Sequence, residues 1–299
     1  PTMEGGPTVS FRPLEVTLAN PESFDTAPVH ALQVVDFDLD GRNELIAVVG
    51  RRVLVLAQVD GRWTERWSYD LSADYHTLWC GDLDDDGDAT ATAPATPPAN
   101  EPSHKADPDL VLSGPGGVLI LENRWETDAT RTLVARAENQ PWGGLTDVSG
   151  TVLFDLDGDG DLDLFTAAPQ PRCFIQRGNW VFAEITERSS LKLEGTPTAV
   201  IAVDWDRDVD LDLLVSTDAG CYWLENMRHG RLRARSLETG YAPLMAARQL
   251  AVTDFDGDGE WDLVGTGPRG TAVFFTQRSL KGSGPGTLRA VQTLPGQPC

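Results

Sequence analysis

The sequence predicts an all-β fold built from repeated units of four short antiparallel strands. An acidic motif recurs five times, at residues 36–45, 82–88, 155–164, 204–213 and 254–263. Short apolar runs rich in Val, Ile, Leu and aromatic residues flank each copy, and Gly, Pro or Asp bound these runs. No segment keeps the 3.6-residue period of an amphipathic helix. The spacing between successive motifs and the four short strands in each unit are typical of the blades of a β-propeller.

The five repeats predict one repeat domain over residues 1–299. In each unit the acidic loop joins the first strand to the second, and a third strand and a more polar fourth strand follow. An Ala/Thr/Pro-rich insert at 89–106 interrupts the second loop, and an additional strand is expected at 9–18. Five motifs predict five blades, while the additional strand leaves open a larger propeller of six or seven blades. The expected blades are 28–72, 75–138, 148–190, 197–240 and 247–295.

Composition limits the possible partners. No apolar stretch approaches the roughly 20 residues of a membrane helix, so we expect no membrane insertion. The formal net charge of −22, from 46 acidic and 24 basic residues, argues against nucleic acid and favours cations. The four cysteines form no CxxC pair, which leaves buried free thiols or one disulfide as alternatives. Because the chain begins at Pro1, it can also be part of a larger multidomain protein.

The five acidic loops share one arrangement of side chains. Carboxylates stand at motif positions 1, 3, 5 and 9, an apolar residue stands at position 2, and leucine stands at position 10. Glycine fills position 6 in four loops, where it permits a sharp turn with positive φ. This regularity is not typical of a solvated charge run. The carboxylates are Asp36, Asp38, Asp40 and Glu44; Asp82, Asp84, Asp86 and Asp109; Asp155, Asp157, Asp159 and Asp163; Asp204, Asp206, Asp208 and Asp212; and Asp254, Asp256, Asp258 and Asp262.

Four carboxylates in one tight turn repel one another unless a cation neutralises them. Calcium takes six to eight oxygen ligands at about 2.3–2.6 Å, so the loops predict up to five structural Ca²⁺ ions. A turn held only by Asp side-chain hydrogen bonds is the alternative without metal. The motif lacks His and Cys, which argues against zinc and copper, and it lacks the Glu at position 12 and the flanking helices of an EF-hand. The carbonyls expected at position 7 belong to Arg42, Asp88, Asp161, Asp210 and Glu260.

The motif D-x-D-x-D-G-x-x-D-L between two strands resembles the FG-GAP and VCBS repeats, the family that includes the integrin α-subunit propellers. The resemblance covers residues 28–280. The full FG-GAP signature is matched only weakly, by GPGG at 114–117 and GPRG at 267–270. It implies a β-propeller with calcium in the acidic loops. Together with the modest calcium affinity of extracellular modules, it also implies an extracytoplasmic location, whether secreted, periplasmic or at the cell surface.

The loops match this pattern to different degrees. We rank 155–163 and 254–262 first as calcium sites because they match it fully. We rank 204–212 last, because Val209 replaces glycine at position 6 and Arg207 adds a cation at position 4. In the second loop, Asp109 can complete the site only if the insert loops outward. In the first loop, Glu44 stands at position 9 in place of Asp, so this side chain is longer.

Residues six positions before the first Asp of each loop would surround one mouth of the central channel. They are either ordinary polar residues at strand edges or a funnel that binds a ligand. These residues are His30, His76, Ser149, Thr198 and Arg248.

The sequence predicts a binding protein and not an enzyme. It contains no G-x-S-x-G motif, P-loop or dinucleotide fingerprint. The predicted function is a non-enzymatic, calcium-binding scaffold for protein or surface interactions, including cell adhesion. The nine tryptophans keep one alternative open, a carbohydrate-binding propeller module of a polysaccharide-acting enzyme. The ligand, protein or glycan, is not identified by the sequence.

Overall fold

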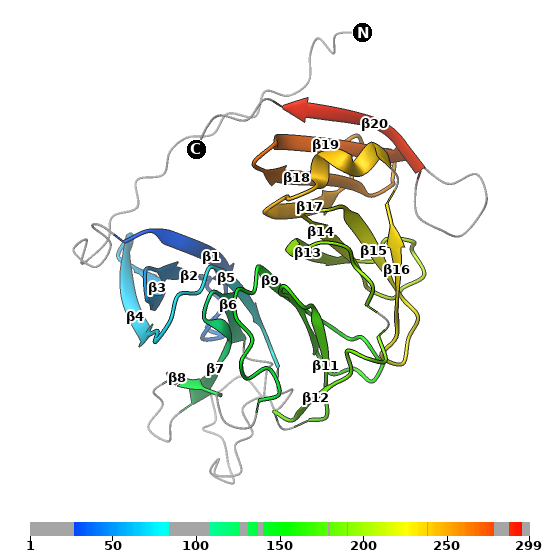
Figure 1. Ribbon diagram of the computed structural model, residues 1–299. Coiled ribbons are helices and arrows are strands. Elements are labelled where there is room, and N and C mark those ends of the chain that lie inside the picture. Colours follow the sequence, from blue (N-terminus) through cyan, green and yellow to red (C-terminus); the bar gives the residue numbers. More distant parts are fainter. Residues whose placement is uncertain are drawn as a thin grey trace.

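A computed structural model describes residues 27–83, 108–125, 131–136, 140–178, 180–189, 191–237, 239–277 and 287–294. These residues form five four-stranded antiparallel blades of a β-propeller (Figure 1), which confirms the predicted fold class. Helix is limited to one 3-10 turn within them, η2 (Thr239–Leu244). The additional strand predicted at 9–18 and the insert predicted at 89–106 lie outside the described residues. No helix in the described part of the chain has the length and apolar character needed to cross a membrane.

Each blade is a meander in which strands that follow one another in the chain pair side by side. Blade 1 contains β1 (Val29–Val35), β2 (Glu44–Val49), β3 (Arg52–Val59) and β4 (Arg62–Asp70). Blade 2 contains β5 (Thr77–Gly81), β6 (Asp109–Gly114), β7 (Gly117–Trp125) and β8 (Arg131–Ala135). Blade 3 contains β9 (Gly150–Phe154), β10 (Asp163–Ala167), β11 (Arg172–Gln176) and β12 (Phe182–Glu184). Blade 4 contains β13 (Pro197–Val203), β14 (Asp212–Thr217), β15 (Cys221–Asn226) and β16 (Leu232–Ser236). Blade 5 contains β17 (Gln249–Thr253), β18 (Asp262–Gly267), β19 (Gly270–Gln277) and β20 (Thr287–Leu294).

The second strand of a blade is its most deeply buried part. Strands β6, β10 and β14 are buried at every position, because strands flank them within the blade and other blades cover both faces. Their sequences are accordingly almost continuously apolar after the initial Asp. The first strands β1 and β17 instead alternate between exposed and partly buried positions, as expected for strands with one solvated face.

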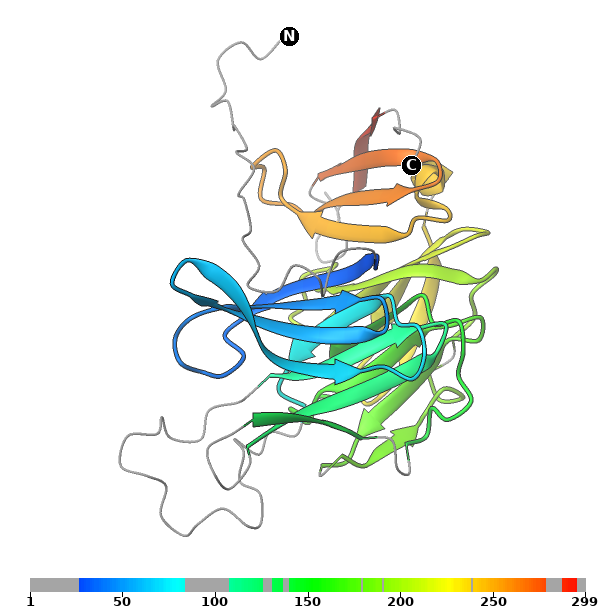
Figure 2. The same cartoon turned by 90° about the vertical axis from the view of Figure 1, so that its left-hand side faces the viewer.

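The blades follow one another around an arc whose inner edge is formed by β1, β5, β9, β13 and β17 (Figure 1). Each inner strand except β17 contacts the inner strand of the next blade. The blades β1–β4 and β17–β20 form the two ends of the arc, and they stand apart in Figure 1 and in the perpendicular view of Figure 2.

Four apolar clusters fill the spaces between successive blades, and all four are built in the same way. Each contains the position 2 residue of one acidic loop and the position 10 leucine of the next loop. The pairs are Phe37 with Leu110, Leu83 with Leu164, Leu156 with Leu213, and Trp205 with Leu263.

The two ends of the arc explain the exceptions to this rule. Phe255, at position 2 of the last loop, is 53% exposed, whereas the corresponding residues of the other loops are at most 3% exposed. Leu45, at position 10 of the first loop, is only partly buried. Position 2 therefore faces the following blade and position 10 faces the preceding blade. Among the described residues, blade 5 has no blade after it and blade 1 has none before it.

Candidate metal centres

The Asp at position 1 organises each fully described acidic loop by accepting backbone N–H groups of the same loop. Oδ1 of Asp155 accepts from Gly158 at 2.7 Å and from Asp159 at 3.2 Å, and Oδ2 accepts from Gly160 at 3.1 Å. The fifth loop repeats this arrangement at Asp254 with nearly the same distances. These bonds wrap the loop around the position 1 carboxylate.

Position 6 has positive φ in every loop that is described in full, as predicted. The φ values are +88° at Gly41, +98° at Gly160 and +86° at Gly259. Val209 adopts +84° in the fourth loop, a conformation that is strained for a β-branched residue. The loop nevertheless keeps its turn, because the N–H groups of Asp208 and Val209 donate to Asp204 at 3.0 and 3.2 Å. The side chain of Val209 is 86% exposed, so the strain comes from the backbone and not from crowding.

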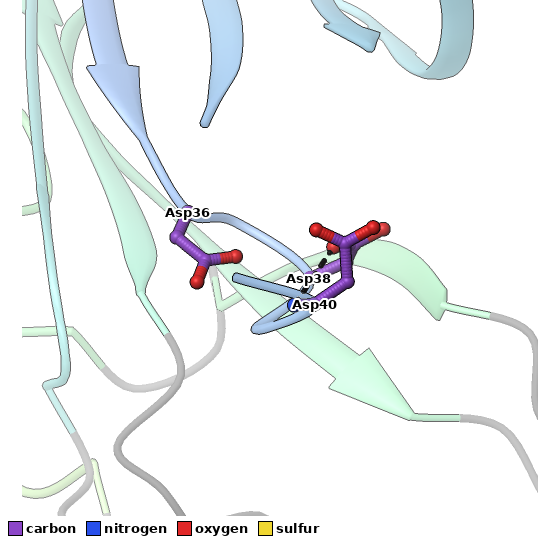
Figure 3. Close-up of side chains that lie close together, drawn as sticks. All are labelled: Asp36, Asp38 and Asp40. Carbon is purple, nitrogen blue, oxygen red and sulfur yellow. Dashed lines mark hydrogen bonds between the residues drawn. The ribbon is translucent and has the colours of Figure 1, made fainter. Parts of the chain in front are cut away.

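Four loops bring three carboxylates close enough to bind one cation. In each of them, one oxygen from each of three acids lies within 4.8 Å of the others. Figure 3 shows the group in the first loop, where the carboxylates of Asp38 and Asp40 lie together and Asp36 stands at the start of the turn. The four groups are Asp36, Asp38 and Asp40; Asp155, Asp157 and Asp163; Asp204, Asp206 and Asp208; and Asp254, Asp256 and Asp262.

Buried oxygens without a partner show that these groups suit a cation. Oδ1 of Asp36, of Asp157 and of Asp206 is buried and has no hydrogen-bond partner among the described residues. A buried carboxylate oxygen without a partner is costly, and a hard cation such as Ca²⁺ is a fitting partner for it. Loss of solvent and the charge of Asp208 raise the pKa of Asp206 to about 6. The positive charge of a cation in the loop would offset both effects and favour the ionised carboxylate.

The acid at position 9 has a second structural role, which the acidic motif alone does not predict. Oδ2 of Asp163 accepts the N–H of Leu156 at 2.8 Å, and Oδ1 accepts the N–H of Gln176 in β11 at 2.8 Å. One buried carboxylate thus links the start of the loop to the third strand of the blade. Burial and the charges of Asp157 and Asp159 raise its pKa to about 7, although the two backbone donors act in the opposite direction.

The position 9 acids of blades 2, 4 and 5 make the same link. Asp212 joins Trp205 to Asn226, Asp262 joins Phe255 to Thr276, and Asp109 joins Leu83 to Asn123. The third-strand partner is a buried polar residue in each of these blades: Asn123, Gln176, Asn226 and Thr276. A polar residue 13 or 14 positions after the position 9 acid, at the end of an apolar run, is the sequence signal that could have revealed the link.

Two of these polar residues also connect successive blades. The side-chain amide of Asn123 donates to the carbonyl of Phe37 in blade 1 at 2.9 Å. The amide of Gln176 donates to the carbonyl of Leu83 in blade 2 at 2.5 Å. In both cases the acceptor is the position 2 carbonyl of the preceding loop. The first and second loops are therefore held by the blade that follows them.

The second loop is described only in part. Asp84, Asp86 and Asp88 lie outside the described residues, as does the insert. Asp82 and Asp109 are described, and Asp109 begins β6 with its carboxylate bonded to Leu83 at 3.0 Å. The chain thus returns to the loop after the insert at the position that a complete motif requires.

Arg207 of the fourth loop reaches across to the fifth loop. Its guanidinium donates to the carbonyl of Gly259, lies 3.7 Å from a carboxylate oxygen of Glu260, and stacks 5.5 Å from the ring centre of Trp261. The cation at position 4 therefore pairs with the neighbouring loop, and the three Asp side chains of its own loop still form a group.

The predicted funnel residues lie at the starts of the inner strands, and the structure brings some of them together. The rings of His30 and His76 stack with their centres 4.5 Å apart. Ser149 and Arg248 line one pocket of about 400 Å³ on the inner side of the arc. Thr198 does not line this pocket, and its hydroxyl bonds to Ser216 instead. Whether these residues bind a ligand stays a prediction.

The described cysteines are free thiols, not members of a disulfide. Burial raises their pKa, to about 12 at Cys80 and Cys173 and to about 11 at Cys221. Cys299 lies outside the described residues.

Comparisons with known proteins agree with this architecture. A model of the FG-GAP-like repeat matches residues 155–215, a segment that contains the third and fourth acidic loops. A search of curated proteins finds no match. A lectin from Agrocybe aegerita, whose structure concerns recognition of non-reducing terminal N-acetylglucosamine, aligns with a TM-score of 0.51 and 18% identity. BBS1N, solved in complex with ARL6DN, aligns with a TM-score of 0.51 and 13% identity.

Both structures share the fold over most of this chain. The alignments cover 90% of this chain, but 66% of the lectin chain and 70% of the BBS1N chain. The chain thus spans less than two thirds of the length of the lectin. At these identities the likeness concerns the fold alone. The recurring acidic loops and the shared architecture describe a β-propeller in which residues 155–215 match the FG-GAP-like repeat.

Proposed function

We propose that the chain is a non-enzymatic propeller whose acidic loops bind Ca²⁺ and whose blades present a surface for protein or cell-surface interactions. The observation that carries the calcium part is a buried carboxylate oxygen in each of three acidic groups that has no hydrogen-bond partner among the described residues. Hard oxygen donors without His or Cys are the chemistry that calcium prefers.

In this proposal the side chains at positions 1, 3, 5 and 9, with the position 7 carbonyl, hold the ion. The bound ion would supply positive charge that neutralises the loop and joins the first two strands of the blade. The position 1 carboxylate orients the loop through its bonds to backbone N–H groups, and the position 9 carboxylate ties it to the third strand. Extracellular calcium at millimolar concentration would saturate sites of modest affinity, so we place the protein outside the cytoplasm.

Calorimetry and thermal unfolding test the calcium part. Protein stripped with a chelator is titrated with Ca²⁺, and its melting temperature is measured with and without the ion. We expect at least four ions to bind, one for each acidic group, and the melting temperature to rise. A site at 100 times its dissociation constant contributes about 2.7 kcal/mol.

Single substitutions link the stoichiometry to individual loops. Asp159→Asn in the third loop should lower the number of bound ions by one, and Asp258→Asn should do the same for the fifth loop. The solvent-exposed Asp60, which lies outside the acidic loops, provides the matched control Asp60→Asn. If wild-type protein binds no Ca²⁺ and its melting temperature does not move, the loops are held by hydrogen bonds alone and the proposal is wrong.

Carbohydrate binding is a second candidate function. The observation that favours it is the shared fold with the Agrocybe aegerita lectin, described as specific for non-reducing terminal N-acetylglucosamine. A glycan array probed with the whole chain tests this candidate. We expect hits that free sugar displaces, whereas an array without hits would leave the protein-interaction role alone.

A further inference from the structure

The pocket on the inner side of the arc has the composition of a site for a small polar ligand. Its volume of about 400 Å³ lies in the range of small-molecule sites. Inner strands of four blades contribute to it, together with β18 of blade 5. The wall combines hydroxyl and amide groups with aliphatic side chains, among them Ser149, Thr151, Val200, Gln249 and Leu250.

Among the described residues that form the pocket wall, the single charged side chain is a cation. Arg248 lines the pocket, its side chain is exposed to solvent, and no carboxylate of the described residues forms an ion pair with it. No acidic side chain of the described part of the chain lines the wall, although the chain carries a formal net charge of −22. A guanidinium in an otherwise neutral wall selects one planar anion, because it can donate two parallel hydrogen bonds to a carboxylate.

The Ser149 hydroxyl is placed to accept a hydrogen bond from a ligand. The Ser149 hydroxyl lies 2.7 Å from the carbonyl oxygen of Ala167 and 2.9 Å from that of Pro197. The hydroxyl proton is therefore donated to a backbone carbonyl, and the lone pairs of the hydroxyl oxygen can accept a hydrogen bond. Such an acceptor suits a ligand that carries hydroxyl groups. Val200 and Leu250 offer apolar contact to C–H groups.

We propose that this pocket binds a sugar acid, a monosaccharide unit with one carboxylate, through an ion pair with Arg248 and hydrogen bonds from the sugar hydroxyls. This inference rests on the carbohydrate-binding candidate and adds to it the site and the ligand class. It does not depend on the metal centres, because none of the described acidic loop residues lines the pocket.

Titration with simple probes tests the proposal. D-glucuronate, D-glucose and acetate are titrated separately into the whole chain in calcium-containing buffer and followed by calorimetry or ligand-observed NMR. We expect D-glucuronate to bind more tightly than either D-glucose or acetate. Arg248→Gln should weaken D-glucuronate binding about tenfold or more, the effect of removing one charge-assisted contact.

Two further variants complete the test. Arg231→Gln changes an exposed arginine outside the pocket and should leave D-glucuronate binding unchanged. Thr266→Val keeps the shape of a residue in the pocket wall, removes its hydroxyl, and should weaken D-glucuronate binding even if Arg248→Gln folds poorly.

The outcomes separate this inference from the function on which it rests. Array hits on neutral glycans that Arg248→Gln does not affect would keep carbohydrate binding and overturn the pocket. Acetate that binds as tightly as D-glucuronate would overturn the sugar part and leave a plain anion site. No binding of D-glucuronate by the wild-type chain would overturn the inference outright.

Discussion

The position 9 carboxylate should stabilise its blade even when no calcium is bound. In Asp163→Ala, the N–H groups of Leu156 and Gln176 lose acceptors that lie 2.8 Å away in the native chain. The carboxylate is fully buried, so water cannot replace it without local opening. Each buried donor left unsatisfied costs about 1–3 kcal/mol, which gives a loss of about 2–6 kcal/mol in the free energy of unfolding. This is a large part of the stability of an ordinary domain.

Asp159→Ala is the matched control for this prediction. Asp159 belongs to the same loop and is expected to bind the same ion, but it is exposed, and its carboxylate accepts a backbone N–H from Asp161, within the loop, at 3.1 Å. Its loss in chelator should therefore cost less than about 1 kcal/mol. In calcium both variants should be destabilised, because each removes one ligand of the proposed site.

Denaturant unfolding measures both variants. Tryptophan fluorescence is followed against urea with excess chelator and again with excess calcium, and the midpoints are compared with those of the wild-type chain. If Asp163→Ala and Asp159→Ala have equal midpoints in chelator, the carboxylate does not link the loop to the third strand, and the role inferred for position 9 is wrong.

Three further predictions concern the packing of the blades. Leu156→Ala, at a buried position 2, should lower the free energy of unfolding by about 2–5 kcal/mol. Phe255→Ala, at the 53% exposed position 2 of the last blade, should lower it by less than about 1 kcal/mol. Equal losses in urea unfolding would contradict the inference that position 2 packs against the following blade. Gln176→Met removes the amide that reaches the carbonyl of Leu83 and should cost about 1–3 kcal/mol, and an unchanged midpoint would show that this contact does not couple the blades. In a Cys80→Ser, Cys299→Ser variant at pH 8, a thiol reagent should react only after unfolding, because the two remaining thiols are buried and burial raises their pKa. Rapid reaction of native protein would contradict this burial. The two thiols are Cys173 and Cys221.

Local patterns in the amino-acid sequence determine much of the fold of this protein. The alternation of acid and glycine in the loops specifies a turn, because a carboxylate at position 1 and positive φ at position 6 act within the same few residues. Apolar runs on either side specify strands for the same local reason. The blade architecture and the acidic groups of four loops follow from these patterns.

The roles of the same motif positions in different blades depend on how the blades pack against one another. Position 2 is buried at Phe37 and exposed at Phe255, although both are phenylalanine, because burial depends on whether another blade follows. Arg207 appears in the sequence as an unfavourable cation inside its own loop, yet it pairs with Glu260 in the next loop. The second role of Asp163 likewise depends on the register between strands, which places the N–H of Gln176 over its carboxylate. Sequence spacing encodes contacts within a loop, whereas contacts between blades arise only when the strands have paired and the blades have packed.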